Sequence, residues 1–166
     1  MHIIKDGRIA ADHWQHLTDD EPPPSHPFTV SLGRWTSQRD TLRQSNPVGV
    51  RLGAADSPEA LAGDLSDLPL IVLQFDSLRD GRSFSHARIL RERLGYTGEI
   101  RARGDFIRDQ MFFLSRLGVD AFEFDDDTTA ARALPALKDF SAVYQPAPGD
   151  RGRDDSGIGS RHHPRY

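Results

Sequence analysis

Short apolar runs alternate with longer amphipathic segments along most of the chain. The clearest run is Leu-Ile-Val-Leu-Gln-Phe at residues 70–75, which is rich in β-formers and almost continuously apolar. Such a run is typical of a central parallel strand that is covered on both faces. The same reasoning predicts strands over residues 28–32, 48–52, 70–75, 99–103, 121–124 and 140–144.

Amphipathic spacing predicts helices between these strands. Ser57 and Pro58 provide an N-cap and a first-turn signal for a helix that reaches about Leu65. Gly95 and Gly118 stand where two other helices should end in a left-handed C-cap. We therefore predict helices over residues 35–43, 57–65, 85–94, 105–117 and 125–137.

The alternation of strands with helices predicts an α/β fold of repeated βα units, with a mainly parallel sheet and right-handed crossovers. Four or five such units are about half the number in a full barrel. The pattern is therefore compatible with an open sheet or with a half-barrel, and it does not choose between them.

Three regions of the chain differ in composition. Residues 1–27 contain an Asp-Gly hairpin signal at residues 6–7, followed by a proline-rich connector. Residues 28–145 form the predicted α/β domain. Residues 146–166 are mostly Gly, Pro, Asp, Arg and Ser. Because such a segment cannot bury enough apolar surface to offset its ordering entropy, we expect a disordered tail.

Composition narrows the classes of function. The chain has 166 residues, about the length of one ordinary domain, and its net charge of −4 gives no overall basic field. We therefore expect no nucleic-acid partner. The absence of cysteine excludes disulfides, thiol redox chemistry and cysteine-ligated clusters within the chain. No Gly-x-Gly-x-x-Gly motif follows a predicted strand, which removes the main sequence evidence for a dinucleotide site. We expect no cofactor of the chain's own.

The cellular compartment is also expected from sequence patterns. The first residues have no basic region leading into an apolar run, so we expect no secretory signal. The longest apolar stretch, at residues 70–73, is far too short to cross a bilayer. Both observations predict a cytoplasmic protein that makes no contact with membranes.

Polar side chains interrupt the predicted strands close to their carboxyl ends, where α/β folds bind ligands. Four of them, Gln74, Arg101, Arg103 and Glu123, predict a polar pocket, in which Glu123 is a candidate acid or base. Two other interpretations stay open. Strand 99–103 could lie at a sheet edge with a solvated face, or Arg101 and Glu123 could form a structural ion pair. The polar strand positions are Arg51, Gln74, Glu99, Arg101, Arg103 and Glu123.

The segment that follows the central strand, residues 76–85, has the residue types of an anion site. It supplies Arg79 and Arg82, a glycine, and serines near a helix N-terminus. Guanidinium groups hold oxyanions with paired hydrogen bonds, and helix N-terminal N–H groups add to this. Asp80 is a second catalytic candidate, although Asp80 and Gly81 are also explained by an ordinary turn. The candidate anion-binding residues are thus Arg79, Arg82, Arg101 and Arg103.

Other polar residues are assigned supporting roles. Asp109 and Gln110 lie on a predicted helix, and we expect them to support the site from behind, together with Gln74. His13 and His16 are spaced as neighbours on one helical turn, but no third ligand is evident, so we expect no metal site. Residues 125–127 are three aspartates that we expect to cap a helix rather than to bind a cation.

Several of these motifs together resemble a known family. The segment from Phe75 to Arg91 reads FDSLRDGRSFSHARILR, and GYTGEIRA follows at residues 95–102. Asp-Gln at residues 109–110, Leu-Gly at 117–118 and Ala-Phe-Glu at 121–123 continue the pattern. Over roughly residues 25–145, the chain resembles a bacterial family of unknown function labelled as an oxidoreductase of sulfite reduction. Members are encoded beside assimilatory sulfite reductase. The resemblance implies a role in sulfite or sulfate assimilation and carries over no catalytic residues.

Two functions are expected on these grounds. The first is an accessory protein of assimilatory sulfite reduction that acts with the sulfite reductase haemoprotein, which would supply the redox centre. The second is a small-molecule enzyme whose anionic substrate lies in an arginine-lined pocket at the carboxyl ends of the strands. A homo-oligomer that completes a half-barrel by pairing is compatible with either function.

Overall fold

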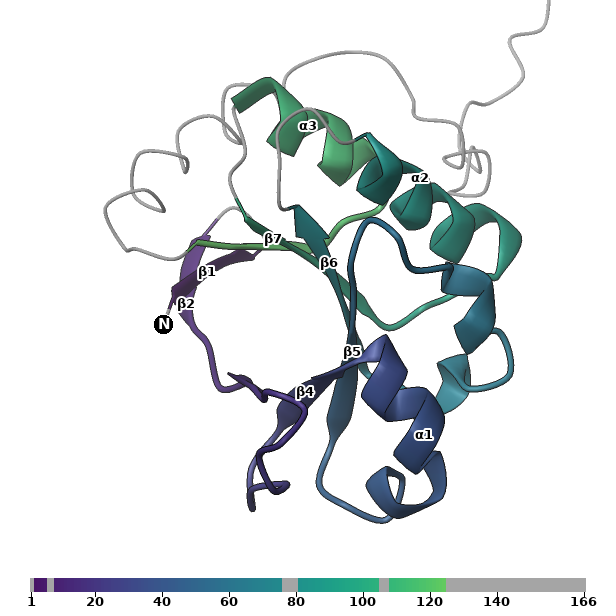
Figure 1. The fold of residues 1–166 in the computed structure, drawn as a ribbon. Helices are drawn as coiled ribbons and strands as arrows, with labels where there is room; N and C mark the ends of the chain where they lie inside the picture. Colours follow the sequence, from purple (N-terminus) through teal and green to yellow (C-terminus); the bar gives the residue numbers. More distant parts are fainter. Residues whose placement is uncertain (1, 6–7, 76–80, 105–107, 125–166) are drawn as a thin grey trace, which may run out of the picture.

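A computed structural model describes residues 2–5, 8–75, 81–104 and 108–124. In these residues the fold is mixed α/β, with one curled eight-stranded sheet and helices on its outer side (Figure 1). The predicted helix 125–137, the predicted strand 140–144 and the predicted disordered tail lie outside the described residues.

The sheet combines parallel and antiparallel strands. Its order is β2-β1-β8-β7-β6-β5-β4-β3. Every pair from β3 to β8 is parallel, whereas β1 is antiparallel to both β2 and β8. The β1–β2 pair is the hairpin predicted around residues 6–7. The strands are β1 (His2–Lys5), β2 (Arg8–Ala11), β3 (Gln15–His16), β4 (Phe28–Ser31), β5 (Val48–Leu52), β6 (Leu70–Phe75), β7 (Glu99–Gly104) and β8 (Ala121–Glu123).

Chain connectivity forces the sheet to curl. Strands β2 and β3 lie at opposite edges of the sheet, yet only residues 12–14 join them. Four Cα steps reach at most about 14 Å. A flat eight-stranded sheet would separate its edges by about 34 Å, since neighbouring strands are about 4.8 Å apart. The two edges must therefore approach each other, which decides between the open sheet and the half-barrel in favour of the half-barrel (Figure 1).

The helices do not follow a regular βα repeat. Helix α1 (Leu32–Leu42) joins β4 to β5, and α3 (Arg108–Arg116) precedes β8. Helix α2 (Arg82–Arg88) continues into a π-helical segment, η3 (Ile89–Arg93), before β7. The prediction of a helix over 57–65 is wrong. This connection contains two short 3₁₀ turns, η1 (Pro58–Leu61) and η2 (Leu65–Asp67), so the unit between β5 and β6 has no α-helix.

Local capping explains where the helices begin and end. Ser57 makes no cap, because its hydroxyl donates to the Glu59 carboxylate instead. Ser31 caps α1 by accepting a hydrogen bond from the Arg34 N–H, so this helix begins at residue 32, earlier than predicted. Gly95, with φ of 65°, and Gly118, with φ of 92°, lie in the left-handed region directly after helical segments, as predicted.

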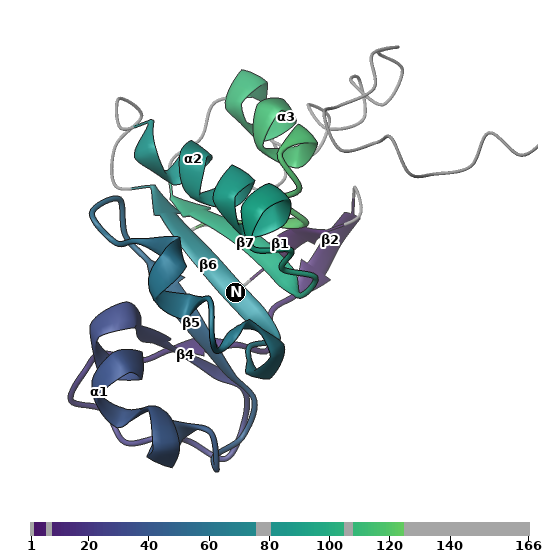
Figure 2. The same ribbon diagram turned by 90° about the vertical axis from the view of Figure 1, so that its right-hand side faces the viewer.

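The two faces of the sheet have opposite character. On the convex face, apolar side chains such as Val50, Ile71 and Ile100 pack against the helices, which Figure 2 shows on one side of the sheet. On the concave face, the side chains are mainly polar or charged. Val72 points to this face and is buried, but it lies outside the helix-side core. Strand β6 is therefore not sandwiched between helix layers, because polar side chains cover its second face.

None of the helices in the described ranges combines the length and apolar character needed to cross a membrane.

Candidate functional site

The concave face of the curled sheet holds a cluster of charged side chains that are largely hidden from solvent. Strands β1, β4, β5, β7 and β8 contribute residues that face the same side by strand register. The chain between the two sheet edges contributes two more from residues 12–16, which we name the closing segment. The concave cluster consists of Lys5, Asp12, His16, Thr29, Arg51, Glu99, Arg101, Arg103 and Glu123.

Arg101 is the centre of this cluster and is only 1% exposed. Its Nη1 donates to Asp12 Oδ2 at 2.8 Å, while Nε and Nη2 donate to Glu99 Oε1 at 3.1 and 2.9 Å. Glu99 also accepts from Lys5 Nζ at 2.6 Å. Burial alone would lower the pKa of Arg101, but the charges of Asp12 and Glu99 outweigh it and raise the pKa. Arg101 therefore stays cationic inside the protein.

Glu123 is fully buried and has a hydrogen-bond partner, His16, and an ion-pair partner, Arg103. His16 Nε2 lies 2.7 Å from its Oε1, and Arg103 Nε lies 3.2 Å from the same oxygen. Burial raises the pKa of Glu123, but the hydrogen bond and the charge of His16, followed by the charges of Arg103 and Arg101, lower it overall. The carboxylate is thus held ionised, which suits it to orient a partner rather than to donate a proton.

Thr29 and Arg51 form the other end of the hydrogen-bonded chain. Thr29 Oγ1 lies 2.6 Å from His16 Nδ1 and accepts from Arg51 Nη1 at 2.9 Å. Arg51 also donates to the carbonyl oxygens of Thr29 and Leu17, at 2.8 and 2.6 Å. Burial and the charge of Arg103 lower the pKa of Arg51. Among the described residues, its hydrogen-bond acceptors are all neutral oxygens.

Most of the strand residues expected at the site do lie together. Gln74, Arg103 and Glu123 occupy one row across β6, β7 and β8, and Arg101 lies two positions earlier on β7. Arg101 also contacts Glu123 at 3.5 Å, which is the ion pair that the sequence left open. These strand residues therefore share one site, and their arrangement is an ion-pair network.

The other candidates lie elsewhere. Arg82 is exposed at the start of α2. Gln110 is half-buried on α3, whose apolar side chains pack into the convex core, so it lies across the sheet from the cluster. Arg79 and Asp80 lie outside the described residues, and so does the side chain of Asp109.

The closing segment was not anticipated as part of a site. The expected helical turn with His13 and His16 is wrong, because residues 12–14 are not helical and His16 belongs to β3. His13 is exposed, whereas the side chain of His16 is only 11% exposed. Asp12, whose carboxylate is 1% exposed, carried no local signal at all. Only pairing of the two sheet edges brings these residues to the cluster.

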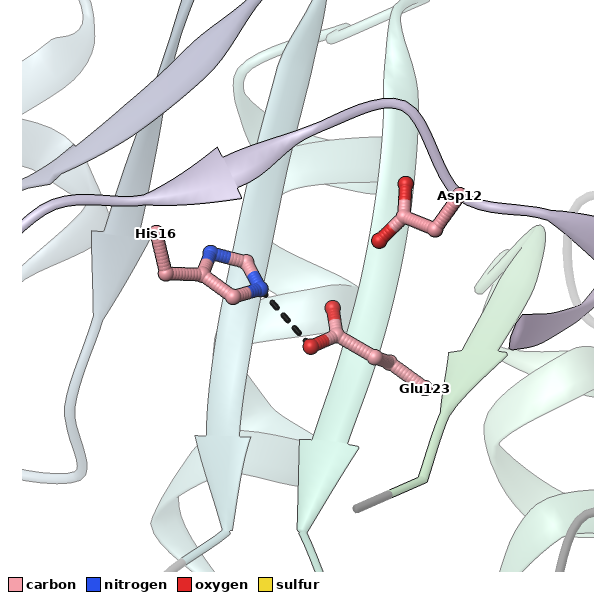
Figure 3. Close-up of side chains that lie close together, drawn as sticks. All are labelled: Asp12, His16 and Glu123. Atoms are coloured by element: carbon pink, nitrogen blue, oxygen red, sulfur yellow. Dashed lines mark hydrogen bonds and ion pairs between the residues drawn. The ribbon is translucent and has the colours of Figure 1, made fainter. Parts of the chain in front are cut away.

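Three side chains of the cluster could in principle present ligands to a metal ion. Ligand atoms of Asp12, His16 and Glu123 all lie within 4.8 Å of one another (Figure 3). However, Arg101 Nη1 already contacts both carboxylates, and Arg103 contacts Glu123 as well. A divalent ion would have to sit against these two guanidinium groups. We therefore assign the three residues to the ion-pair network and not to a metal site.

Fold and site together define a class: a curled α/β sheet protein with buried ion pairs on its concave face. Residues 49–152 match the model of a family described as bacterial protein of unknown function (DUF934). The match spans more than half of the chain, and the protein belongs to this family. The expected resemblance to a bacterial family of unknown function is thus confirmed, and the link to sulfite reduction stays a prediction. No curated protein matches the chain.

The matched range divides the concave cluster. It includes Arg51 on β5 and the cluster residues of β7 and β8, whereas Lys5, Asp12, His16 and Thr29 precede it. The family match therefore covers the strands that carry the arginines, and the N-terminal segment adds the histidine and the hydroxyl group.

Proposed function

We propose that this protein is an accessory protein of assimilatory sulfite reduction that binds a small oxyanion on its concave face. In this role it acts with the sulfite reductase haemoprotein, which supplies the redox centre. The oxyanion part of the proposal is supported by the geometry of the concave cluster. The partner is suggested by the family resemblance carried by the motifs at residues 75–102 and 109–123.

The observation that carries the oxyanion site is the electrostatic position of Arg51. Its guanidinium is half-buried, repelled by Arg103, and bonded to neutral oxygens. By contrast, Arg101 is fully occupied by three carboxylates. An anion placed between Arg51 and Arg103 would relieve the repulsion between them. Guanidinium groups favour planar, paired contacts with such oxyanions.

Accessibility supports the same position. The Arg103 side chain is 28% exposed, whereas Arg101 and Glu123 are closed off from solvent. A ligand that approaches this row of the concave face therefore meets Arg103 before the Glu123 carboxylate. This order of approach selects for negative charge, because the first group encountered is cationic.

Calorimetric titration of the purified chain with sulfate and with sulfite tests the oxyanion site. We expect saturable binding, and at least about tenfold weaker binding in Arg103→Gln, because a charged hydrogen bond contributes about 1.5–3 kcal/mol. Arg93→Gln is the matched control, since that side chain is 67% exposed and pairs with Glu59 away from the cluster. Equal affinity in wild type and Arg103→Gln would refute the site.

A pull-down with the sulfite reductase haemoprotein tests the partner. We expect capture of the haemoprotein and a change in its sulfite reductase activity when the chain is added. A protein that binds sulfate but neither captures the haemoprotein nor alters its activity would contradict the accessory role and leave the anion site standing.

One observation favours the alternative, an enzyme with an anionic substrate. Thr29, His16 and Glu123 form a continuous hydrogen-bonded chain, an arrangement in which a histidine can move a proton between a hydroxyl group and an ordered partner. In that case the proton carrier would be His16 rather than Glu123. Incubation of the chain alone with sulfate and phosphate esters tests this alternative. Oxyanion released by wild type and not by His16→Gln would support it, and no release by wild type would argue against it.

A further inference from the structure

The imidazole of His16 lies between Glu123, whose carboxylate only accepts hydrogen bonds, and Thr29, whose hydroxyl group can either donate or accept one. Glu123 is ionised, so the hydrogen in the 2.7 Å contact belongs to His16 Nε2. At Nδ1, Thr29 Oγ1 lies 2.6 Å away and can either donate or accept. Both protonation states of the imidazole therefore fit the same heavy-atom positions.

The direction of the Thr29 hydroxyl distinguishes the two states. Arg51 only donates, so its 2.9 Å contact uses a lone pair of Thr29 Oγ1. When His16 is neutral, the Thr29 hydroxyl hydrogen points to Nδ1. When His16 is protonated, Nδ1 donates to Thr29 instead. Both lone pairs of Thr29 Oγ1 then accept, from Nδ1 and from Arg51 Nη1, so the hydroxyl hydrogen turns to the third tetrahedral direction, away from both donors.

The charges around His16 act on its protonation in both directions. Glu123 and Asp12 favour a positive charge on the imidazole, whereas the neighbouring arginines disfavour it. An oxyanion at Arg51 and Arg103 would offset the repulsion from these arginines and so favour protonation of His16. The charged or titratable groups that face His16 are Glu123 from β8, Asp12 from the closing segment, Arg51 from β5, and Arg101 and Arg103 from β7.

We infer that oxyanion binding on the concave face is coupled to the uptake of one proton at His16, with Thr29 changing from donor to acceptor at Nδ1. The inference rests on the proposed oxyanion site and specifies how that site is regulated. By linkage, a ligand that favours protonation binds more tightly when the proton is already present. Anion affinity therefore rises as the pH falls through the titration of His16, by up to about tenfold per pH unit.

Sulfate is the probe that isolates this effect, because it remains a dianion throughout the range of about pH 5–8 in which histidine titrates. Calorimetric titrations at one pH in two buffers of different ionisation enthalpy measure the protons taken up per sulfate bound. We expect an uptake of up to one proton near the titration of His16, with affinity falling towards higher pH. His16→Gln keeps a donor and an acceptor at this position but cannot titrate.

The variant comparison decides the inference. In His16→Gln we expect sulfate to bind without proton uptake, whereas His13→Gln, an exposed histidine of the same segment, should behave as wild type. Binding by wild type without proton uptake overturns the coupling and leaves the oxyanion site intact. Uptake that persists in His16→Gln places the proton elsewhere and also overturns it. No sulfate binding by wild type refutes the proposed oxyanion site itself.

Discussion

Replacing Arg101 by methionine tests whether the concave cluster behaves as one buried network. Methionine keeps most of the side-chain volume and removes the charge that faces Asp12, Glu99 and Glu123. Removing one partner of a buried ion pair costs about 3–5 kcal/mol, because the other charge stays buried. For a chain of this length, 1 kcal/mol corresponds to about 2–4 °C in Tm, so we expect a loss of about 6–20 °C.

The pH dependence of this loss separates a charge effect from a packing effect. Without Arg101, the folded-state pKa values of the buried carboxyls should rise, because their cation is gone. The deficit in the free energy of unfolding should then be largest near pH 7 and shrink towards about pH 4, where these carboxyls protonate in the unfolded chain too. Thermal and urea unfolding followed by circular dichroism at several pH values measures it.

A matched control shows how much stability is lost when an exposed arginine is replaced in the same way. Arg88 pairs with Glu92 one helical turn away, and its side chain is 64% exposed. We expect Arg88→Met to change stability by less than about 1 kcal/mol. A deficit of that small size in Arg101→Met, or a large deficit that does not change with pH, would refute the view that ion pairing holds the concave face together.

Two further predictions concern single positions. The lowered pKa of Glu123 stabilises the folded state above the unfolded value of about 4.3, and this contribution is lost as the pH falls through the folded pKa. Glu123→Gln should therefore be less stable than wild type near pH 7 and lose this deficit in acid, whereas a constant difference in urea unfolding would contradict the assigned shift. Gly104 has φ of 133°, and a Cβ there would collide with the Phe75 carbonyl. Gly104→Ala should lower stability by more than about 1 kcal/mol, and an unchanged Tm would show that β7 takes a different path.

The faces of the strands could be predicted from the sequence because side-chain alternation in a strand is a local property. Arg101 and Arg103 fall on the same face whatever the neighbours are, and Gln74 and Glu123 join them once the strands pair in parallel. The sequence signals for helices were less reliable than the side-chain alternation of the strands. The connection after β5 carries the capping signal Ser57-Pro58, yet it folds as two 3₁₀ turns.

The closing of the sheet could not be predicted in the same way. His16 meets Glu123 across 107 residues, and Asp12 meets Arg101 across 89. Neither contact leaves a local pattern, because residues 12–14 are irregular and the spacing of His13 and His16 predicts a helical turn instead. The signal that could have revealed them is geometric: a short link between segments that pair with opposite edges of one sheet.

Burying the charged side chains of the concave cluster costs free energy, so a contribution to stability does not by itself explain why the cluster is there. Buried ion pairs can often be replaced by apolar side chains of similar volume without loss of stability. The convex face of the same sheet shows that apolar packing was available to these strands. On the concave face, Arg101 is neutralised by carboxylates, but Arg51 is not bonded to a carboxylate among the described residues and has its pKa lowered by burial and by Arg103. The charges of Asp19 and Glu123 only partly offset this burial and repulsion. A purely structural network would gain little from a guanidinium so placed, whereas a site for an oxyanion requires one.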